Sequence, residues 1–329
     1  MKNIIVITTI NEPTEAVERF SRLSDFRLVV IGDKKTPRNW HWHNAIFLGV
    51  DSPESRAFSL SSALPFNHYS RKMLGYLHAV KLGAETIVDT DDDNIPKEDW
   101  AFPAFDGNYE CSVDNIGFVN IYKHFTDRHI WPRGLPLRLI NDKRSLQKAL
   151  LPQNARVGVW QGLADEDPDV DAIYRLTSDE PCYFASRNPI VLNKGTISPF
   201  NSQNTVFRKE LFTLLYLPAF VTFRFTDILR SFVGLPIMWL YGYGLGFTNA
   251  TVVQKRNVHD YFHDFLSEIP MYQHGENVIE IVRSATSAGR SIAENLRLAY
   301  DALRRNGVVP DEELKTLECW LKDMEGLGA

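Results

Sequence analysis

The chain has 329 residues, of which 44% are hydrophobic and 23% charged, and its formal net charge is −5. This is an ordinary globular composition with room for a large domain, and it excludes a disordered or fibrous chain. The negative net charge provides no general attraction for nucleic acid, so any anion must be bound by a local site. Cys111, Cys182 and Cys319 are scattered and odd in number. They predict buried thiols in a reducing compartment rather than a disulfide framework.

The first third of the chain alternates apolar strand patterns with helical patterns. The predicted elements are a strand at 4–9, a helix at 13–23, strands at 26–31 and 45–50, a helix at 68–82 and a strand at 84–88. Gly83 is a suitable C-cap for the second helix. Strands separated by helices predict a parallel sheet with right-handed crossovers. The expected fold class is therefore α/β, of a nucleotide-binding type.

The rest of the chain is expected to be loop-rich and then helical. Loops are predicted at 131–136, 154–171 and 199–204, and amphipathic helices at 277–305 and 311–324. Loops this long in a compact domain usually carry function.

One uncharged stretch, 232–253, is long enough to cross a membrane. Pro236 and four glycines favour instead a buried segment near a ligand pocket. Peripheral contact with a membrane through its aromatic residues stays open. The apolar run at the N-terminus is too short for a signal peptide, so we expect a cytoplasmic protein, either free or peripheral at the inner face of a membrane.

The most informative motif is Ile-Val-Asp-Thr-Asp-Asp-Asp-Asn at 87–94. Asp89, Asp91, Asp92 and Asp93 place four carboxylates within five positions, where like charges repel and raise one another's pKa values. A divalent cation relieves that repulsion. Ligands of α/β proteins bind beyond the carboxyl ends of the strands, so the motif predicts a metal site at a strand end, with Asp89 supporting the turn.

Eight short segments along residues 4–272 resemble the STELLO-type glycosyltransferases. They are 7–13, 32–37, 69–76, 87–94, 131–136, 167–176, 201–205 and 223–230. A more distant similarity links the chain to the reversibly glycosylated polypeptides, which include UDP-arabinopyranose mutases.

The resemblance implies a GT-A fold, a Rossmann-like nucleotide-sugar-binding fold with a mainly parallel central sheet. It implies a GT-A domain at 1–272, followed at 273–329 by a C-terminal helical extension that the resemblance does not cover. Plant members of the family are Golgi membrane proteins with large N-terminal extensions, whereas this chain is expected to be the bare catalytic domain.

The activity implied is metal-dependent transfer of a sugar from a nucleotide-diphosphate sugar, with UDP favoured, to a glycan, a lipid-linked glycan or another hydroxyl acceptor. Mn²⁺ or Mg²⁺ would neutralise the charge that grows on the leaving diphosphate. Asp91 to Asp93 fit the D-x-D motif of GT-A enzymes, which implies that Asp93 ligates the metal and Asp91 contacts metal or ribose. Asp92 would lie near the sugar. His259 is expected to complete the metal shell, with His263 as its competitor.

Further residues are expected to hold the donor. Thr8 and Thr9, at the end of the first strand, would meet the base and ribose. Asp33 would accept the N3–H of uracil, or else cap its own turn. Arg71 and Lys72 would reach the phosphates or the base, and Lys255 the diphosphate.

Two acids are candidates for catalysis. An inverting transferase needs a carboxylate that takes the proton of the acceptor hydroxyl. Asp227 is the first candidate, with a structural salt bridge to Arg224 or Arg230 as its alternative role. Asp171, near the sugar with Asp169, is the second. The sequence leaves the inverting and retaining mechanisms open.

Three other functions remain as alternatives. The first is a UDP-sugar mutase, which would rearrange the sugar on its nucleotide. The second is a non-catalytic protein that organises glycan synthesis. The third is a haloacid-dehalogenase-like phosphatase, in which Asp89 would be the nucleophile and Asp91 the acid.

Overall fold

The computed structural model describes residues 2–142, 150–178, 180–255 and 260–329. The strands in this part of the chain are β1 (Asn3–Thr9), β2 (Phe26–Gly32), β3 (Ala45–Leu48), β4 (Thr86–Thr90), β5 (Asn94–Pro96), β6 (Asp106–Ser112), β7 (Gly117–Phe118), β8 (Leu150–Asp165), β9 (Ile190–Leu192), β10 (Thr196–Ile197), β11 (Asn204–Arg208) and β12 (Gly244–Gln254). The α-helices are α1 (Glu15–Phe20), α2 (Pro53–Arg56), α3 (Leu60–Ala63), α4 (Lys72–Lys81), α5 (Ala172–Thr177), α6 (Thr226–Leu240), α7 (Tyr261–Ala285), α8 (Ile292–Arg305) and α9 (Asp311–Gly326).

The N-terminal part is the parallel unit that the sequence predicts. β1 pairs in parallel with β2 on one side and with β4 on the other, and β2 pairs in parallel with β3. Ile4 to Ile7 of β1 are fully buried, because both faces of this part of the sheet are covered. A 3₁₀ turn, Tyr69–Arg71, leads into α4, and Gly83 follows that helix with a φ of +79°. The expected C-cap is therefore confirmed.

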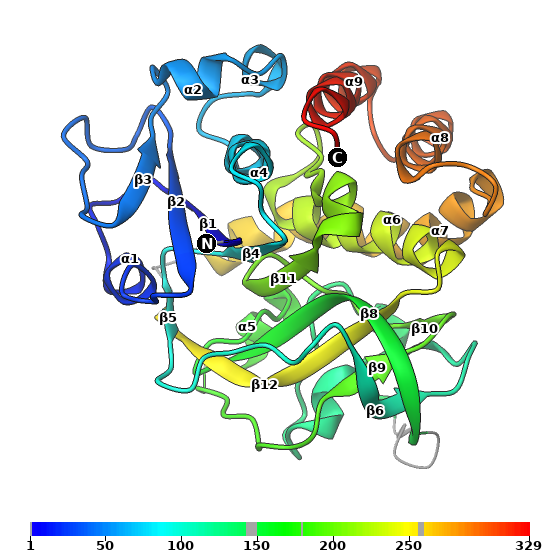
Figure 1. The fold of residues 1–329 in the computed structure, drawn as a ribbon. Coiled ribbons are helices and arrows are strands. Elements are labelled where there is room, and N and C mark those ends of the chain that lie inside the picture. The colour runs from blue at the N-terminus through cyan, green and yellow to red at the C-terminus, as the bar shows by residue number, and fades with distance from the viewer. Residues whose placement is uncertain (1, 143–149, 179, 256–259) are drawn as a thin grey trace.

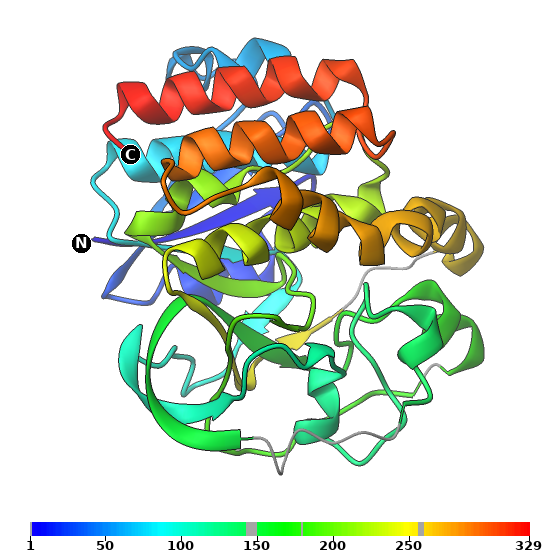
Figure 2. The same ribbon diagram turned by 90° about the vertical axis from the view of Figure 1, so that its right-hand side faces the viewer.

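Beyond β4 the sheet becomes mixed. Among the described residues it has ten strands in the order β3-β2-β1-β4-β11-β8-β6-β9-β12-β5. β11 runs antiparallel to both β4 and β8, whereas β12 pairs in parallel with β8, and β9 with β6. The parallel pairing that the sequence predicts is therefore continuous through β3-β2-β1-β4 and alternates with antiparallel pairing beyond it. β8 pairs with β6 along its first half and with β12 along its second, and β9 joins β6 to β12. These four strands curl around one another in the lower half of the molecule (Figure 2).

The loop predicted at 154–171 is wrong, because most of it belongs to the 16-residue strand β8. Gly158 and Gly162 lie within this strand and allow close packing. A Cβ at Gly158 would lie 2.4 Å from the Leu211 side chain, and one at Gly162 would lie 2.3 Å from that of Asn204. A glycine within a strand often marks such a close approach.

The uncharged stretch 232–253 is buried, as predicted. It forms the end of α6 and most of β12, and Phe232, Tyr243 and Phe247 are all buried. Trp239 is buried as well, and Tyr241 is partly exposed. No helix in the described part of the chain is both long and apolar enough to cross a membrane.

The C-terminal helices pack against the rest of the molecule. The single helix predicted at 277–305 is in fact two, because α7 ends at Ala285 and a capping box of Ser291 and Glu294 begins α8. Helix α9 begins at 311, as predicted. Tyr300 of α8 and Trp320 of α9 belong to the same apolar core as residues of α4 and α6. The last two helices lie side by side along one side of the molecule (Figures 1 and 2).

Close packing of α4 on the sheet predicts a stability effect at Gly75. A Cβ there would lie 2.5 Å from Val6 Cγ1 and 2.9 Å from Ile31 Cγ1, and both side chains are held in the core. We expect Gly75→Ala to lower the free energy of unfolding by about 1–3 kcal/mol, measured by chemical denaturation. Gly289→Ala is the control, because nothing lies within 4 Å of its added Cβ. Equal stability of the two variants would contradict the prediction.

Candidate functional site

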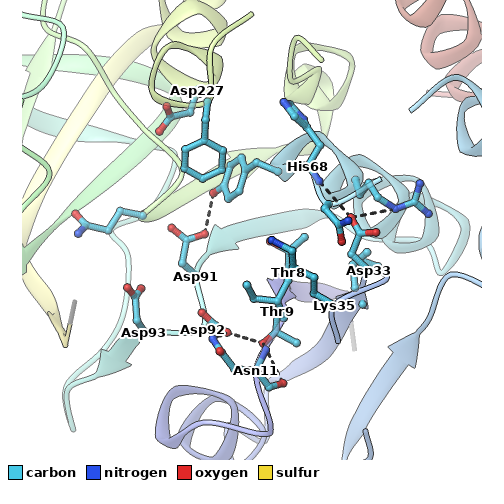
Figure 3. Close-up of a pocket in the computed structure, with 18 of the residues that line it drawn as sticks. Thr8, Thr9, Asn11, Asp33, Lys35, His68, Asp91, Asp92, Asp93 and Asp227 are labelled. Carbon is cyan, nitrogen blue, oxygen red and sulfur yellow. Dashed lines mark hydrogen bonds and ion pairs between the residues drawn. The ribbon is translucent and has the colours of Figure 1, made fainter. Parts of the chain in front are cut away.

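A pocket of about 550 Å³ opens where β1, β2 and β4 end (Figure 3). Thr8 and Thr9 line it from β1, Asp33 from the end of β2, and Asp91 to Asp93 from the turn after β4. The carboxyl ends of parallel strands meet at one edge of a sheet, so these segments converge although they are distant in sequence. Residues near the start of α6 and the end of β12 complete the wall.

Beneath the pocket lies a buried cluster of three charges. Asp89 is fully buried, and its two oxygens lie 2.6 Å from Lys72 Nζ and 2.8 Å from Arg230 Nη1. Burial opposes ionisation, but Lys72 and Arg230 lower the pKa of Asp89 below its usual value. Asp89 thus supports the turn after β4 through long-range ion pairs, which join it to α4 and α6.

Asp91 is the next acid along and is held on one oxygen only. Its Oδ1 accepts hydrogen bonds from Lys72 Nζ (2.9 Å) and from the hydroxyl of Tyr69 (2.7 Å). Burial raises the pKa of Asp91, although Lys72 acts in the opposite direction. Lys72 was expected to reach phosphates or the base. The structure instead places it under the acidic motif, fully buried and outside the pocket lining.

Among the described residues, Asp92 and Asp93 accept side-chain hydrogen bonds from neutral groups only. Asp92 accepts hydrogen bonds from the Thr9 hydroxyl and, at 3.0 Å, from Asn11 Nδ2. Asp93 accepts one from Gln254 Nε2 at 3.2 Å. Within the described ranges no cationic side chain forms an ion pair with either carboxylate. Burial and the neighbouring Asp91 and Asp92 raise the pKa of Asp93 to about 7.

The unbalanced charge fits a divalent cation, although the protein supplies few ligands. No group of three or more His, Cys, Asp or Glu side chains among the described residues is arranged to hold a metal ion. An ion here would therefore take its remaining oxygen ligands from a phosphate group or from water, as Mg²⁺ commonly does. His259, the expected additional ligand, lies outside the described residues. His263 is exposed at the start of α7.

Asp33 and Arg71 form the opposite end of the pocket. The Asp33 carboxylate accepts hydrogen bonds from the backbone N–H of Lys34 (2.7 Å) and of His68 (3.2 Å), so it does cap its own turn. Arg71 Nε lies 3.6 Å from the same carboxylate. Arg71 is buried, yet its Nε and Nη1 have no hydrogen-bond partner among the residues that the structure describes. A buried guanidinium with unused donors, at a pocket wall, is suited to bind a ligand oxygen.

Asp227 lies in the pocket wall but is not a free acid. Arg133 donates from Nη1 and Nη2 to its two oxygens, at 2.9 and 2.8 Å. The same guanidinium binds both oxygens of Asp169, each at 2.8 Å. The salt bridge expected with Arg224 or Arg230 is therefore made with Arg133. The motif at 131–136 was noticed in the sequence, but no local pattern connects it to an acid some 90 residues later.

Two predicted site residues are not part of the pocket lining. Asp171 is fully buried at the N-cap of α5, where it accepts hydrogen bonds from Tyr174 N (2.9 Å) and Trp131 Nε1 (2.7 Å). Burial raises the pKa of Asp171 to about 6. Lys255 follows the lining residue Gln254 and its N–H donates to the backbone oxygen of Asp93 at 3.0 Å, but its side chain is exposed and pairs with Glu166 at 2.9 Å.

The structure also adds pocket residues that the sequence reasoning missed. Most of them are neutral, so no charge motif marked them. Tyr69 and Phe223 form part of the wall with their rings edge to face, 5.7 Å between centroids. The other additions are Asn11, His68, Gln203 and Gln254, together with the cationic Lys35 and Arg133.

Comparison with known proteins agrees with the motif resemblance. The model for the family described as STELLO glycosyltransferases matches residues 224–329. Two Arabidopsis thaliana proteins, "Probable glycosyltransferase STELLO1" and "Probable glycosyltransferase STELLO2", are each 26% identical to this chain over an alignment of 343 positions. Each alignment covers 98% of this chain, which spans 44% of STELLO1 and 45% of STELLO2.

The similarity therefore runs through the C-terminal helices, beyond residue 272, where the sequence motifs ended. The mixed α/β architecture with its large central sheet is consistent with the GT-A-like fold that the motifs implied. The comparisons thus support the resemblance of this chain to the STELLO-type glycosyltransferases along nearly its whole length.

Proposed function

We propose that this chain is a glycosyltransferase that takes a sugar from a nucleotide-diphosphate sugar, with UDP as the nucleotide, in the presence of Mn²⁺ or Mg²⁺. The acceptor would be a hydroxyl of a glycan, either free or linked to a lipid. The charge balance of the pocket carries the proposal. Asp33, Asp91, Asp169 and Asp227 each lie beside a buried cationic side chain. Asp92 and Asp93 lack one in the described part of the chain, so negative charge without a paired cation accumulates at the turn after β4.

That place suits a cation shared with a diphosphate. Asp93 would hold the ion, with Asp91 or Asp92 adding an oxygen. When bound, the ion supplies a Lewis acid that stabilises the growing charge of the leaving diphosphate. Gln254 orients Asp93 from β12, and Thr9 and Asn11 orient Asp92 from β1. The protein thus holds its two uncompensated carboxylates from opposite sides of the turn.

The other end of the pocket is complementary to uracil. Uracil offers one N–H donor between two carbonyl acceptors. The Asp33 carboxylate can accept that N–H, and the unused donors of Arg71 can bind a neighbouring carbonyl. Cytosine presents an acceptor where uracil has N3–H, so it would leave Asp33 without a donor. This contrast supports UDP over CDP.

Asp227 is proposed as the acid that faces the acceptor hydroxyl. It is the carboxylate of the pocket wall at the start of α6. Arg133 fixes its orientation through hydrogen bonds to both of its oxygens, and a carboxylate oxygen is a strong acceptor for a hydroxyl group. Proton transfer to Asp227 would require that its bond with Arg133 lengthen when substrate binds.

The phosphatase alternative does not fit this geometry. Its nucleophile would be Asp89, which is fully buried, bound to Lys72 and Arg230 and outside the pocket lining. The mutase alternative uses the same donor pocket, so an assay distinguishes it. Isomerised nucleotide sugar without released nucleoside diphosphate would identify a mutase. Failure to bind any nucleotide would favour a role in organising other enzymes.

The metal proposal is tested at Asp93. With Mn²⁺ present we expect Asp93→Asn to bind UDP only as tightly as the wild type does in EDTA, because the ion loses its main protein ligand. Isothermal titration calorimetry measures the affinities, and released UDP from a panel of UDP-sugars reports turnover. Asp99→Asn, which removes an exposed acid six residues later, should behave as wild type. Wild-type turnover by Asp93→Asn in EDTA would refute the proposal.

Base selectivity is tested at Asp33. An unsatisfied buried polar group costs about 1–3 kcal/mol, so we expect wild-type protein to bind UDP at least about fivefold more tightly than CDP. Asp33→Asn should reduce this ratio towards one, because an amide can donate to cytosine N3. Titration of both nucleotides measures the ratio, with circular dichroism confirming the fold. An unchanged ratio in the variant would remove Asp33 from base recognition.

The role of Asp227 is tested by separating binding from turnover. If Asp227 takes the acceptor proton, Asp227→Asn should lower kcat by about 100-fold or more while UDP affinity changes less than twofold. A loss of kcat of tenfold or less would limit Asp227 to a positioning role.

A further inference from the structure

Helix α9 lies outside the pocket but carries a buried acid without a cationic partner among the described residues. Glu313 is fully buried, and burial raises its pKa. Its carboxylate accepts hydrogen bonds from the Tyr216 hydroxyl, from Ala219 N (3.0 Å) and from Phe220 N (2.8 Å). Burying a carboxylate is costly, so the groups that Glu313 binds indicate its role.

Glu313 holds a segment that has no regular structure of its own. Residues 216–222 form neither helix nor strand, so their backbone donors need partners from elsewhere. Glu313 binds the N–H groups of Ala219 and Phe220, and Met73 Sδ lies 3.1 Å from Leu217 N. The segment is thus fixed from outside, and mainly by α9.

The held segment leads directly into the pocket. Three residues after Phe220 come Phe223 and then Arg224, and Asp227 follows at the start of α6, all three lining the pocket. The position of this wall therefore depends on the backbone that Glu313 binds.

A second acid of the same helix holds the opposite wall. The Asp323 carboxylate accepts hydrogen bonds from Ser59 N (3.0 Å), Ser59 Oγ (2.8 Å) and Leu60 N (2.8 Å), and so caps α3. The chain leaves α3 at Ala63 and soon reaches His68 and Tyr69, which line the pocket. The Tyr69 ring packs edge to face against the Phe223 ring in the pocket wall.

We infer that α9 acts as a brace, that is, a rigid helix that fixes the positions of two pocket walls. Glu313 and Asp323 are positioning residues: Glu313 fixes the wall that contains Phe223, and Asp323 fixes the wall that contains Tyr69. The two acids are ten residues apart, about 15 Å along a straight helix. A rigid helix of that length can hold both segments at a constant separation. The C-terminal helices are then part of the binding apparatus, and a partner that displaced α9 would change the pocket. The consequence for ligand binding rests on the proposed donor site.

The test pairs each acid with an exposed neighbour on the same helix. Glu313→Gln is compared with Glu312→Gln, and Asp323→Asn with Glu325→Gln, since Glu312 and Glu325 are exposed. Hydrogen–deuterium exchange without nucleotide should show faster exchange at 64–70 in Asp323→Asn and at 217–225 in Glu313→Gln, and in neither control. Under conditions where all variants are folded, UDP affinity should fall about tenfold in the two brace variants only, within the usual range of coupling between sites.

Coupling is reciprocal, so UDP bound to the wild type should slow exchange within α9. The proposal would be overturned if the two brace variants had lower melting temperatures but kept wild-type UDP affinity and wild-type exchange at both walls. The two acids would then have a structural role only. If Glu313→Gln fails to fold, hydrogen–deuterium exchange and UDP affinity of Asp323→Asn alone decide whether the proposal holds. If the wild type binds no nucleotide, the donor-site proposal fails, and exchange at the two walls still decides whether α9 holds them.

Discussion

The structure depends on one buried ion cluster, Asp89 with Lys72 and Arg230. It joins the end of β4 to α4 and α6, three elements far apart in the sequence. Buried ion pairs contribute little net stability, but removing one partner leaves an uncompensated charge and costs several kcal/mol, about 3–5. The cluster therefore selects one arrangement of these elements. Because Lys72 also binds Asp91, the same cluster orients the first acid of the pocket.

The pocket above it is electrostatically divided. At the α6 end, Arg133 binds both Asp169 and Asp227 through four hydrogen bonds. At the β4 turn, the side-chain donors that Asp92 and Asp93 receive from the described residues are hydroxyl and amide groups. In the part of the chain that the structure describes, these two carboxylates have no paired cation, an arrangement that suits a charged ligand supplying one.

Much of the parallel half and the acidic motif could be predicted from sequence. Local patterns carry that information: apolar runs for β1, β2 and β4, a C-cap at Gly83, and carboxylates directly after a strand. Pairings across long distances in the chain could not be predicted. Nothing near Arg133 indicates Asp227 as its partner, and nothing near Gly158 and Gly162 indicates that Leu211 and Asn204 pack against them. Lys72 looked like a phosphate ligand because burial cannot be read from two adjacent basic residues.

The sequence by itself determined the alternating α/β plan, the metal-type carboxylate motif and the family resemblance, because each depends on residues close together in the chain. Only the tertiary structure decided which acids have cationic partners, that the side chains of Asp171 and Lys255 are not part of the pocket lining, and that α9 binds the segments leading to two of its walls. The physical reason is common to all three. Charge compensation and burial depend on which segments meet in space, and a side chain's neighbours are set by the packing of the whole chain.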